Sequence, residues 1–126
     1  MIKVYVVKQS NYPVSSPKIK KRLREVLKEK GIVSKTEVNV ALVDEKKMKS
    51  LARKYLKENK VHNVLSFTAE EAKDFKTPPD GVIRLGEIAV CFPVALQEAK
   101  KEGKLTEEKV LELVEHGAYH LLGIHH

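Results

Sequence analysis

A chain of 126 residues, of which 42% are apolar and 33% charged, has the length of one domain spanning residues 1–126 and a composition outside the low-hydrophobicity range of disordered proteins. Its apolar runs are shorter than the roughly 20 residues that span a bilayer, and its first residues alternate too strictly for a signal peptide, so we expect a cytoplasmic protein. The 24 Lys and Arg against 17 Asp and Glu give a net charge of +7, which indicates either a polyanionic partner such as nucleic acid or a lysine-rich solvated surface.

The first half of the chain alternates strands with helices. Alternating, β-branched residues predict strands over residues 2–8 and 36–43. Ser16 followed by Pro17 predicts the N-cap and first position of a helix that closes at Gly31. A second helix is expected after an aspartate cap, Asp44, and its inward side chains are expected to be Met48, Leu51, Tyr55 and Leu56.

The second half begins with two short strands, NVLSF over residues 63–67 and GEIAVC over residues 86–91, on either side of a loop over residues 68–82. Cys91 is the single cysteine, and we expect it to be a buried small apolar residue without a disulfide. Pro93 then leads into a helix ending near Gly103, and Thr106 is expected to cap the closing helix. Four strands among four helices predict an α+β fold in which a mixed sheet of about four strands packs with helices, and they leave the strand order open.

The last eleven residues, at the end of the closing helix and beyond it, hold four of the five histidines of the chain. Its apolar stripe is expected to comprise Val110, Leu113, Val114, Gly117 and Leu121. His116 and His120 lie one turn apart at the edge of that stripe, so both imidazoles can bind one metal ion. Gly123 allows the chain to turn back, and His126 then completes the spacing H-x3-H-x5-H. Three neutral imidazoles favour zinc, one ion per chain, with other divalent metals as alternatives, and His125 is expected beside the site or in solvent.

The zinc proteases with this histidine spacing have a glutamate directly after the first histidine, and here that residue is Gly117. Peptidase chemistry is therefore disfavoured. A metal ion held by three histidines still lowers the pKa of a bound water toward roughly 7, which suits hydrolysis or the polarisation of a phosphoryl oxygen. The positive net charge suggests that this oxygen belongs to a nucleic acid.

Three segments together resemble the YbeY family of metal-dependent endoribonucleases and ribosomal RNA maturation factors. The closing HGAYHLLGIHH resembles the family signature H-G-x-L-H-L-x-G-Y-D-H, NVLSF resembles D-V-L-S-F-P, and LGEIAV resembles L-G-D-I-x-I. The resemblance implies a zincin-like metal site on the last helix, with His116, His120 and His126 as ligands and Ser66 on a strand bordering the site. An alternative role for Ser66 is equally well supported: as the polar residue of an alternating strand, it would make a structural hydrogen bond with its hydroxyl.

Other positions depart from the family pattern. Leu56 stands where the family has an arginine linked to RNA cleavage, and Arg53 or Lys57 is the candidate to reach the same phosphate. Asn59, His62 and Asn63 replace Asp, Thr and Asp, Thr68 replaces Pro, and Ile124 and His125 replace Tyr and Asp.

The sequence thus predicts a zinc-dependent endoribonuclease specific for single strands, acting in ribosomal RNA maturation and ribosome quality control, with RNA or ribosomal subunits as partners. Glu87 and Glu115 are both candidates for the general base. Two alternatives remain: a non-catalytic RNA-binding ribosome-assembly factor with a structural metal, and a zinc hydrolase of another substrate.

Overall fold

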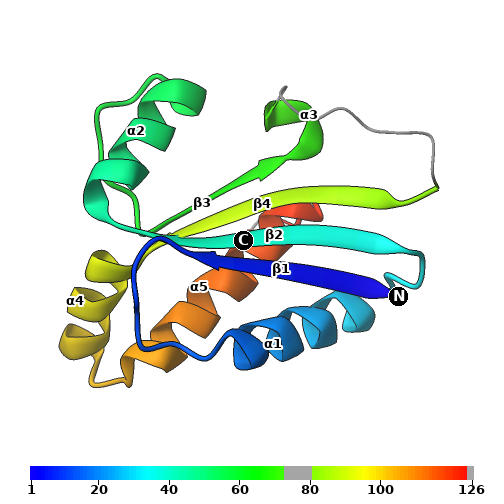
Figure 1. Cartoon of the computed structure of the whole chain (residues 1–126), viewed down its shortest axis with the longest axis horizontal. Helices are drawn as coiled ribbons and strands as arrows, with labels where there is room; N and C mark the ends of the chain where they lie inside the picture. The colour runs from blue at the N-terminus through cyan, green and yellow to red at the C-terminus, as the bar shows by residue number, and fades with distance from the viewer. Residues whose placement is uncertain (73–80, 125–126) are drawn as a thin grey trace.

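A computed structural model describes residues 1–72 and 81–124 (Figure 1). Its sheet comprises β1 (Ile2–Lys8), β2 (Thr36–Val43), β3 (Val64–Thr68) and β4 (Ile83–Cys91) in the order β1-β2-β4-β3. Neighbours β1, β2 and β4 run parallel, whereas β3 pairs antiparallel with β4. The mixed four-stranded sheet is confirmed, and the structure supplies the strand order that the sequence leaves open.

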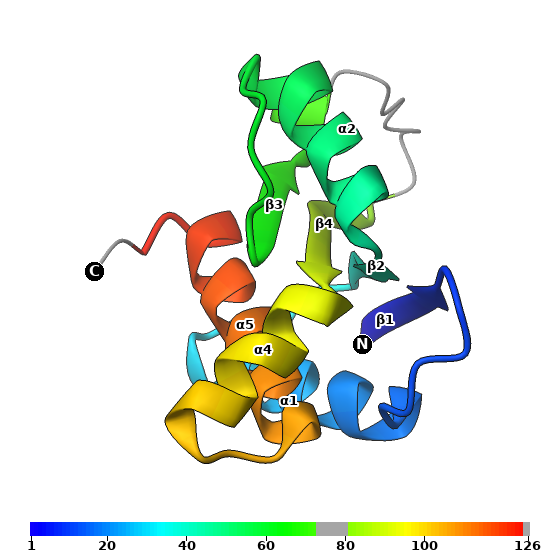
Figure 2. The same ribbon diagram turned by 90° about the vertical axis from the view of Figure 1, so that its left-hand side faces the viewer.

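Helices cover the two faces of the sheet unequally. One face carries α1 (Ser16–Glu29), α4 (Phe92–Glu102) and α5 (Thr106–Leu121), and the other carries α2 (Glu45–Leu56) (Figures 1 and 2). A fifth helix, α3 (Ala69–Ala72), follows β3 directly. The prediction of an unstructured loop over residues 68–82 is therefore wrong at its start, and residues 73–80 of that loop lie outside the described part of the chain.

The core has two parts, one on each face of the sheet. The larger part joins β1, β2 and β4 to the three-helix face, and its fully buried members include Ile19, Leu23, Leu27, Val40, Ile88 and Val110. The smaller part lies under α2 and contains Val43, Met48, Ala52, Leu65, Phe67, Ala89 and Cys91. Cys91 is fully buried at the end of β4, as expected, and this burial raises the pKa of its thiol. Leu56 was expected inside but is 41% exposed at the end of α2.

Two helix starts differ from the predicted ones by one residue. The N-cap of α1 is Ser15, not Ser16, because the Ser15 hydroxyl accepts the backbone N–H of Lys18. The N-cap of α5 is Leu105, so Thr106 is already the first helical residue and no side chain caps this end. Asp44 caps α2 as predicted, by accepting the backbone N–H of Lys47 at 2.8 Å.

A close approach of backbones joins β3 to β4. Gly86 faces Thr68 across the pair and has a φ of +138°, and a Cβ at this position would overlap the carbonyl oxygen of Phe67. Only glycine fits there. Among the described residues, no helix has the length and apolar character needed to cross a membrane.

Candidate active site

The apolar stripe of α5 orients the two described histidines of this helix. Val110, Leu113, Val114, Gly117 and Leu121 are all buried, as predicted. His116 and His120 are both exposed, one turn apart, at the border of that stripe. The end of α5 that carries them lies beside β3 (Figure 2). The two imidazoles therefore stand together at the edge of the sheet, where a small ligand can reach both.

Gly117 lets α5 sit directly on the sheet between these histidines. A Cβ at this position would lie 2.7 Å from Cγ2 and 3.2 Å from Cγ1 of Ile88, a fully buried residue of β4. A glutamate at residue 117, as in the zinc proteases, would have to displace this contact. The absence of the protease glutamate is therefore a packing requirement of this chain as well as a chemical difference.

Ser66 lies on the same face of the sheet as α5. It pairs across the strands with Ile88, the residue under Gly117, and its neighbours Leu65 and Phe67 point to the opposite face, toward α2. Side chains alternate along a strand, so the partly exposed Ser66 hydroxyl faces the histidine end of α5. The structure thus brings together Ser66, His116 and His120.

A carboxylate joins this group from α3. The backbone N–H of Thr68 donates to Oε1 of Glu71 at 3.0 Å, and the backbone N–H of Glu71 donates to Oγ1 of Thr68 at 3.2 Å. This reciprocal capping box holds the Glu71 carboxylate with Oε1 3.9 Å from Nε2 of His120. The hydrogen bond from the Thr68 backbone lowers the pKa of Glu71, so this carboxylate is an anion at neutral pH. The spacing Thr-x-x-Glu is the sequence signal for it, inside the segment predicted to be a loop.

The two carboxylates considered as general bases from the sequence lie elsewhere. Glu87 faces the opposite side of the sheet, under α2. Glu115 accepts a hydrogen bond from the Tyr119 hydroxyl at 2.7 Å and lies 3.3 Å from a guanidinium nitrogen of Arg22 in α1. Glu71 is the carboxylate that the structure places against a histidine of the site.

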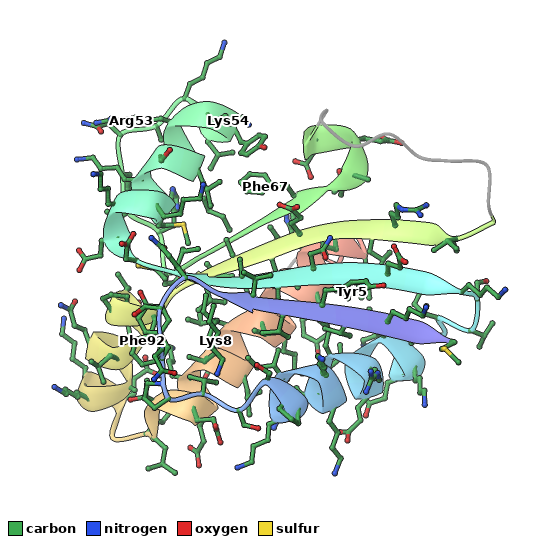
Figure 3. The ribbon with its side chains drawn as sticks, in the orientation of Figure 1. Tyr5, Lys8, Arg53, Lys54, Phe67 and Phe92 are labelled. Atoms are coloured by element: carbon green, nitrogen blue, oxygen red, sulfur yellow. The ribbon has the colours of Figure 1, made fainter. Side chains whose placement is uncertain are left out.

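The cations considered as substitutes for the family arginine are carried by the end of α2. The guanidinium of Arg53 donates through Nε and Nη2 to Oδ1 of Asn59, at 3.0 and 2.8 Å. Figure 3 shows Arg53 on the side of α2 away from Phe67. Lys57 ends the helix in the left-handed conformation, with a φ of 56°. Both cations are exposed and belong to the face of the sheet opposite α5.

Three other departures from the family pattern have structural partners. Nε2 of His62 lies 2.7 Å from a carboxylate oxygen of Glu58, and the Asn63 amide donates to Glu98 of α4 at 3.1 Å. Thr68 belongs to the capping box of α3. The contacts of Asn63 and Thr68 tie the two ends of β3 to α4 and α3, whereas the contact of His62 is local to the connection after α2.

The donors at this end of α5 suit a zinc ion, which binds imidazole nitrogen and carboxylate oxygen. Gly123 has a φ of +75° and its N–H donates to the His120 carbonyl, so the chain turns after the helix as predicted. His125 and His126 lie outside the described residues. Within residues 1–72 and 81–124, no three His, Cys, Asp or Glu side chains form a preassembled metal group, so the two exposed imidazoles are the part of the predicted ligand set that the structure describes.

Comparisons with known proteins show what this chain is similar to. A family model described as Endoribonuclease YbeY matches residues 5–126. Proteins of that name from Macrococcus caseolyticus and Thermus thermophilus are 34% identical over 110 residues, which cover 87% of this chain and 71% and 76% of the relatives. One from Acinetobacter baumannii is 32% identical over 108 residues, 86% of this chain and 68% of its own. A solution structure from Thermotoga maritima matches with a TM-score of 0.58 at 27% identity, over 98% of this chain and 74% of that one.

Proposed function

Because this chain belongs to the YbeY endoribonuclease family, we propose that it is a metal-dependent endoribonuclease that cleaves single-stranded RNA. Its setting is ribosomal RNA maturation and ribosome quality control in the cytoplasm, with ribosomal RNA or ribosomal subunits as partners. The observation that supports the proposal is the pair of exposed imidazoles on α5, which faces the Ser66 hydroxyl and the Glu71 carboxylate.

His116, His120 and His126 hold one zinc ion per chain in this proposal. When bound, such an ion polarises a phosphoryl oxygen and lowers the pKa of a bound water toward about 7. The chain contributes the surroundings. Gly117 fixes the height of the two described histidines above β4, and Gly123 ends the helix in a turn.

Glu71 is the proposed positioning carboxylate. Its Oε1 is held by the Thr68 backbone 3.9 Å from Nε2 of His120, where it can accept a hydrogen bond from the attacking water. Ser66 can donate its hydroxyl proton to a phosphate oxygen that approaches along β3. Arg53 or Lys57 contributes positive charge to flanking phosphates, and Arg53 does so by exchanging Asn59 for a phosphate oxygen.

The test is metal content together with cleavage of a short single-stranded RNA. The wild-type protein, His120→Ala and a matched control, His62→Ala, are compared. His62 is the suitable control because it is also a partly exposed histidine, and its described partner is Glu58. We expect one ion per chain and cleavage in the wild type and the control, and loss of both in His120→Ala. A protein that binds no ion, or a His120→Ala variant that cleaves at the wild-type rate, would contradict the proposal.

One observation favours a second candidate, a non-catalytic RNA-binding assembly factor with a structural metal. Leu56 occupies the position of the family arginine and is exposed, and the neighbouring guanidinium of Arg53 is engaged by Asn59. This alternative predicts one bound ion, no cleavage by the wild type, and a lower melting temperature after chelation. The variant Leu56→Arg separates the two functions, since restored cleavage would trace the deficit to that one position.

A further inference from the structure

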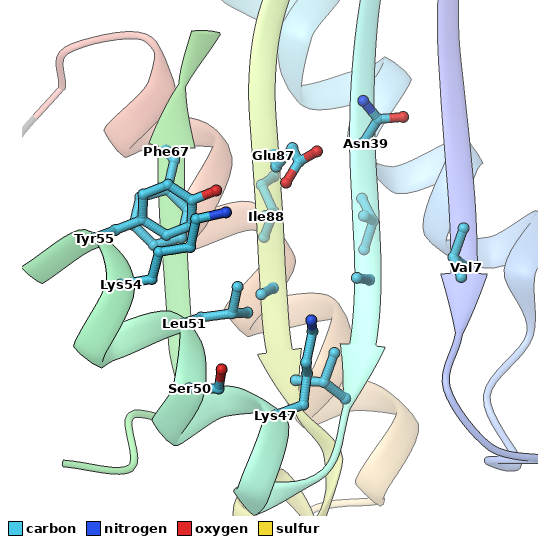
Figure 4. Close-up of a pocket in the computed structure, with 14 residues that line it drawn as sticks. Val7, Asn39, Lys47, Ser50, Leu51, Lys54, Tyr55, Phe67, Glu87 and Ile88 are labelled. Atoms are coloured by element: carbon cyan, nitrogen blue, oxygen red, sulfur yellow. The ribbon is translucent and has the colours of Figure 1, made fainter. Parts of the chain in front are cut away.

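A hollow lies on the face of the sheet that α5 does not cover. It has a volume of about 430 Å³ and runs between α2 and strands β2 and β4 (Figure 4). We call it the α2 groove, and the residues that matter for its chemistry are Asn39, Lys47, Lys54, Tyr55, Phe67 and Glu87. None of them belongs to the histidine site, because α2 and α5 lie on opposite faces of the sheet.

One wall of the α2 groove is aromatic and rigid. The rings of Tyr55 and Phe67 are packed with their centroids 4.5 Å apart at an interplanar angle of 41°. Phe67 is 4% exposed and is fixed within the smaller part of the core, so Tyr55 is held against a support that does not move. A planar, partly apolar group such as a nucleobase can pack along a wall of this kind.

The side of the groove formed by α2 is strongly cationic. Residues 45–60 contain seven basic and two acidic side chains. Lys47 and Lys54 are the two that line the groove, and Figure 4 shows the Lys47 side chain rising between α2 and β2. The Lys54 ammonium lies 5.1 Å from the centre of the Tyr55 ring. Lys54 therefore stands at the aromatic wall, whereas Lys47 stands at the other end of the groove, where its ammonium can bind the phosphate attached to a base.

The end of the groove away from Lys47 carries polar groups that suit hydrogen-bond donors rather than a phosphate. Asn39 of β2 and Glu87 of β4 are direct partners in the parallel pair, and both face the groove (Figure 4). A carboxylate accepts hydrogen bonds from the amino and imino groups of a base edge, and an amide both donates and accepts. Lys47 and Glu87 thus stand at opposite ends of the groove, which gives the groove a direction, and Lys54 lies at the same end as Glu87.

We propose that the α2 groove binds one nucleotide of a single-stranded nucleic acid, with its phosphate at Lys47, its base along the Tyr55 wall, and its base edge toward Asn39 and Glu87. The inference rests on the proposed function only for the identity of the strand. Ser66 and Phe67 are consecutive residues of edge strand β3 that face the histidine site and the groove respectively. A single strand crossing that edge reaches both sites.

The first experiment maps the binding of 5′-GMP and of inorganic phosphate by backbone amide chemical shifts. A mononucleotide has no phosphodiester bond to cleave, so the outcome is independent of nuclease activity. We expect GMP to shift the amides of Asn39, Tyr55 and Glu87 and to bind more tightly than phosphate. Shifts confined to the α5 end, or GMP and phosphate binding equally, would overturn the proposal, the latter by leaving an anion site without a base pocket.

The second experiment measures the affinity of a ten-nucleotide single-stranded DNA, used as a strand that an endoribonuclease does not cut, for Lys47→Glu and for the control Lys46→Glu. Both change the net charge equally in the first turn of α2, where a glutamate favours the helix, but only Lys47 lines the groove. Lys47→Glu is expected to weaken binding about tenfold and to reduce the slope of log K against log salt by about 0.7, the value for one lost contact to a single strand. Equal losses in the two variants would show a diffuse charge effect and refute the groove.

Discussion

Replacing Gly117 by alanine tests the link between packing and the histidine site. The added Cβ would approach Ile88 Cγ2 to 2.7 Å, about 1 Å inside the usual separation of carbon atoms in contact. Ile88 is fully buried and β4 is held between β2 and β3, so α5 is the element that has to move. Overpacking of this kind costs about 1–3 kcal/mol, and the better helix propensity of alanine offsets about 1 kcal/mol of that.

The net expectation for Gly117→Ala is a destabilisation of up to about 2 kcal/mol, with a fall in melting temperature of about 4 °C for each kcal/mol. Urea unfolding monitored by circular dichroism measures it. Zinc affinity is expected to fall in the same variant, because a displaced α5 carries His116 and His120 away from β3.

A double-mutant cycle gives the sharpest form of this test. Ile88→Ala alone is expected to cost about 2–5 kcal/mol through the cavity that it leaves. In that background only the Cβ at position 88 remains, 3.5 Å from the new methyl group, so Gly117→Ala is expected to stabilise by about 0.5–1 kcal/mol. The same substitution thus changes sign with its neighbour. If alanine at 117 is tolerated equally well in both backgrounds, the contact with Ile88 does not set the position of α5.

Four further outcomes follow from individual contacts. Glu71→Gln should weaken zinc binding in a competition assay with a chelating dye, because it removes a negative charge 3.9 Å from Nε2 of His120. Glu70→Gln, at the neighbouring exposed residue, should leave zinc binding unchanged. Asp44→Ala removes the N-cap of α2 and should lower the free energy of unfolding by about 1 kcal/mol, measured by urea titration. The pKa of Glu107 is lowered by its hydrogen bond with a lysine of α1. The ionised Glu107 carboxylate therefore stabilises the fold above the unfolded pKa of about 4.3, and this stabilisation is lost as the pH falls through the lower folded pKa. The difference in unfolding free energy between wild type and Glu107→Gln should therefore close on acidification. Cys91, buried and with a raised thiol pKa, should react with a thiol reagent only as fast as the protein unfolds, and rapid labelling of the native state would contradict its placement.

The elements that the sequence predicts best are those whose periodicity matches their burial. Residues 2–8 and 36–43 alternate because alternate side chains of β1 and β2 enter the core, and both strands have the predicted bounds. Helix α3 has four residues, too few for an amphipathic period, and only its capping box marks it. The helical pattern places Leu56 inside, but the buried residues of α2 are Met48 and Ala52 alone, so its buried stripe is narrow and Leu56 at its end is in solvent.

The candidate site likewise combines features that a local sequence pattern predicts with contacts between distant elements that it does not predict. The spacing of His116 and His120 along one helix is a local property, and the turn at Gly123 follows from a single residue type. The contact between Glu71 and His120 joins residues on two different elements. It depends on β3 lying at the edge of the sheet next to α5, which no pattern in the sequence specifies. The same holds for the α2 groove, whose lining comes from five separate elements.

The insertion of β4 between β2 and β3 has a consequence for folding kinetics. Before β4 is in place, β3 has no strand to pair with, and the β2–β4 pair itself joins residues as far apart as Val38 and Gly86. Closing that long segment is slow relative to helix formation, so β3 with Ser66 and α3 with Glu71 join the structure late. Interactions formed after the transition state slow unfolding without accelerating folding. A bound ion at the histidines is therefore expected to lower the unfolding limb of a chevron plot and leave its folding limb in place.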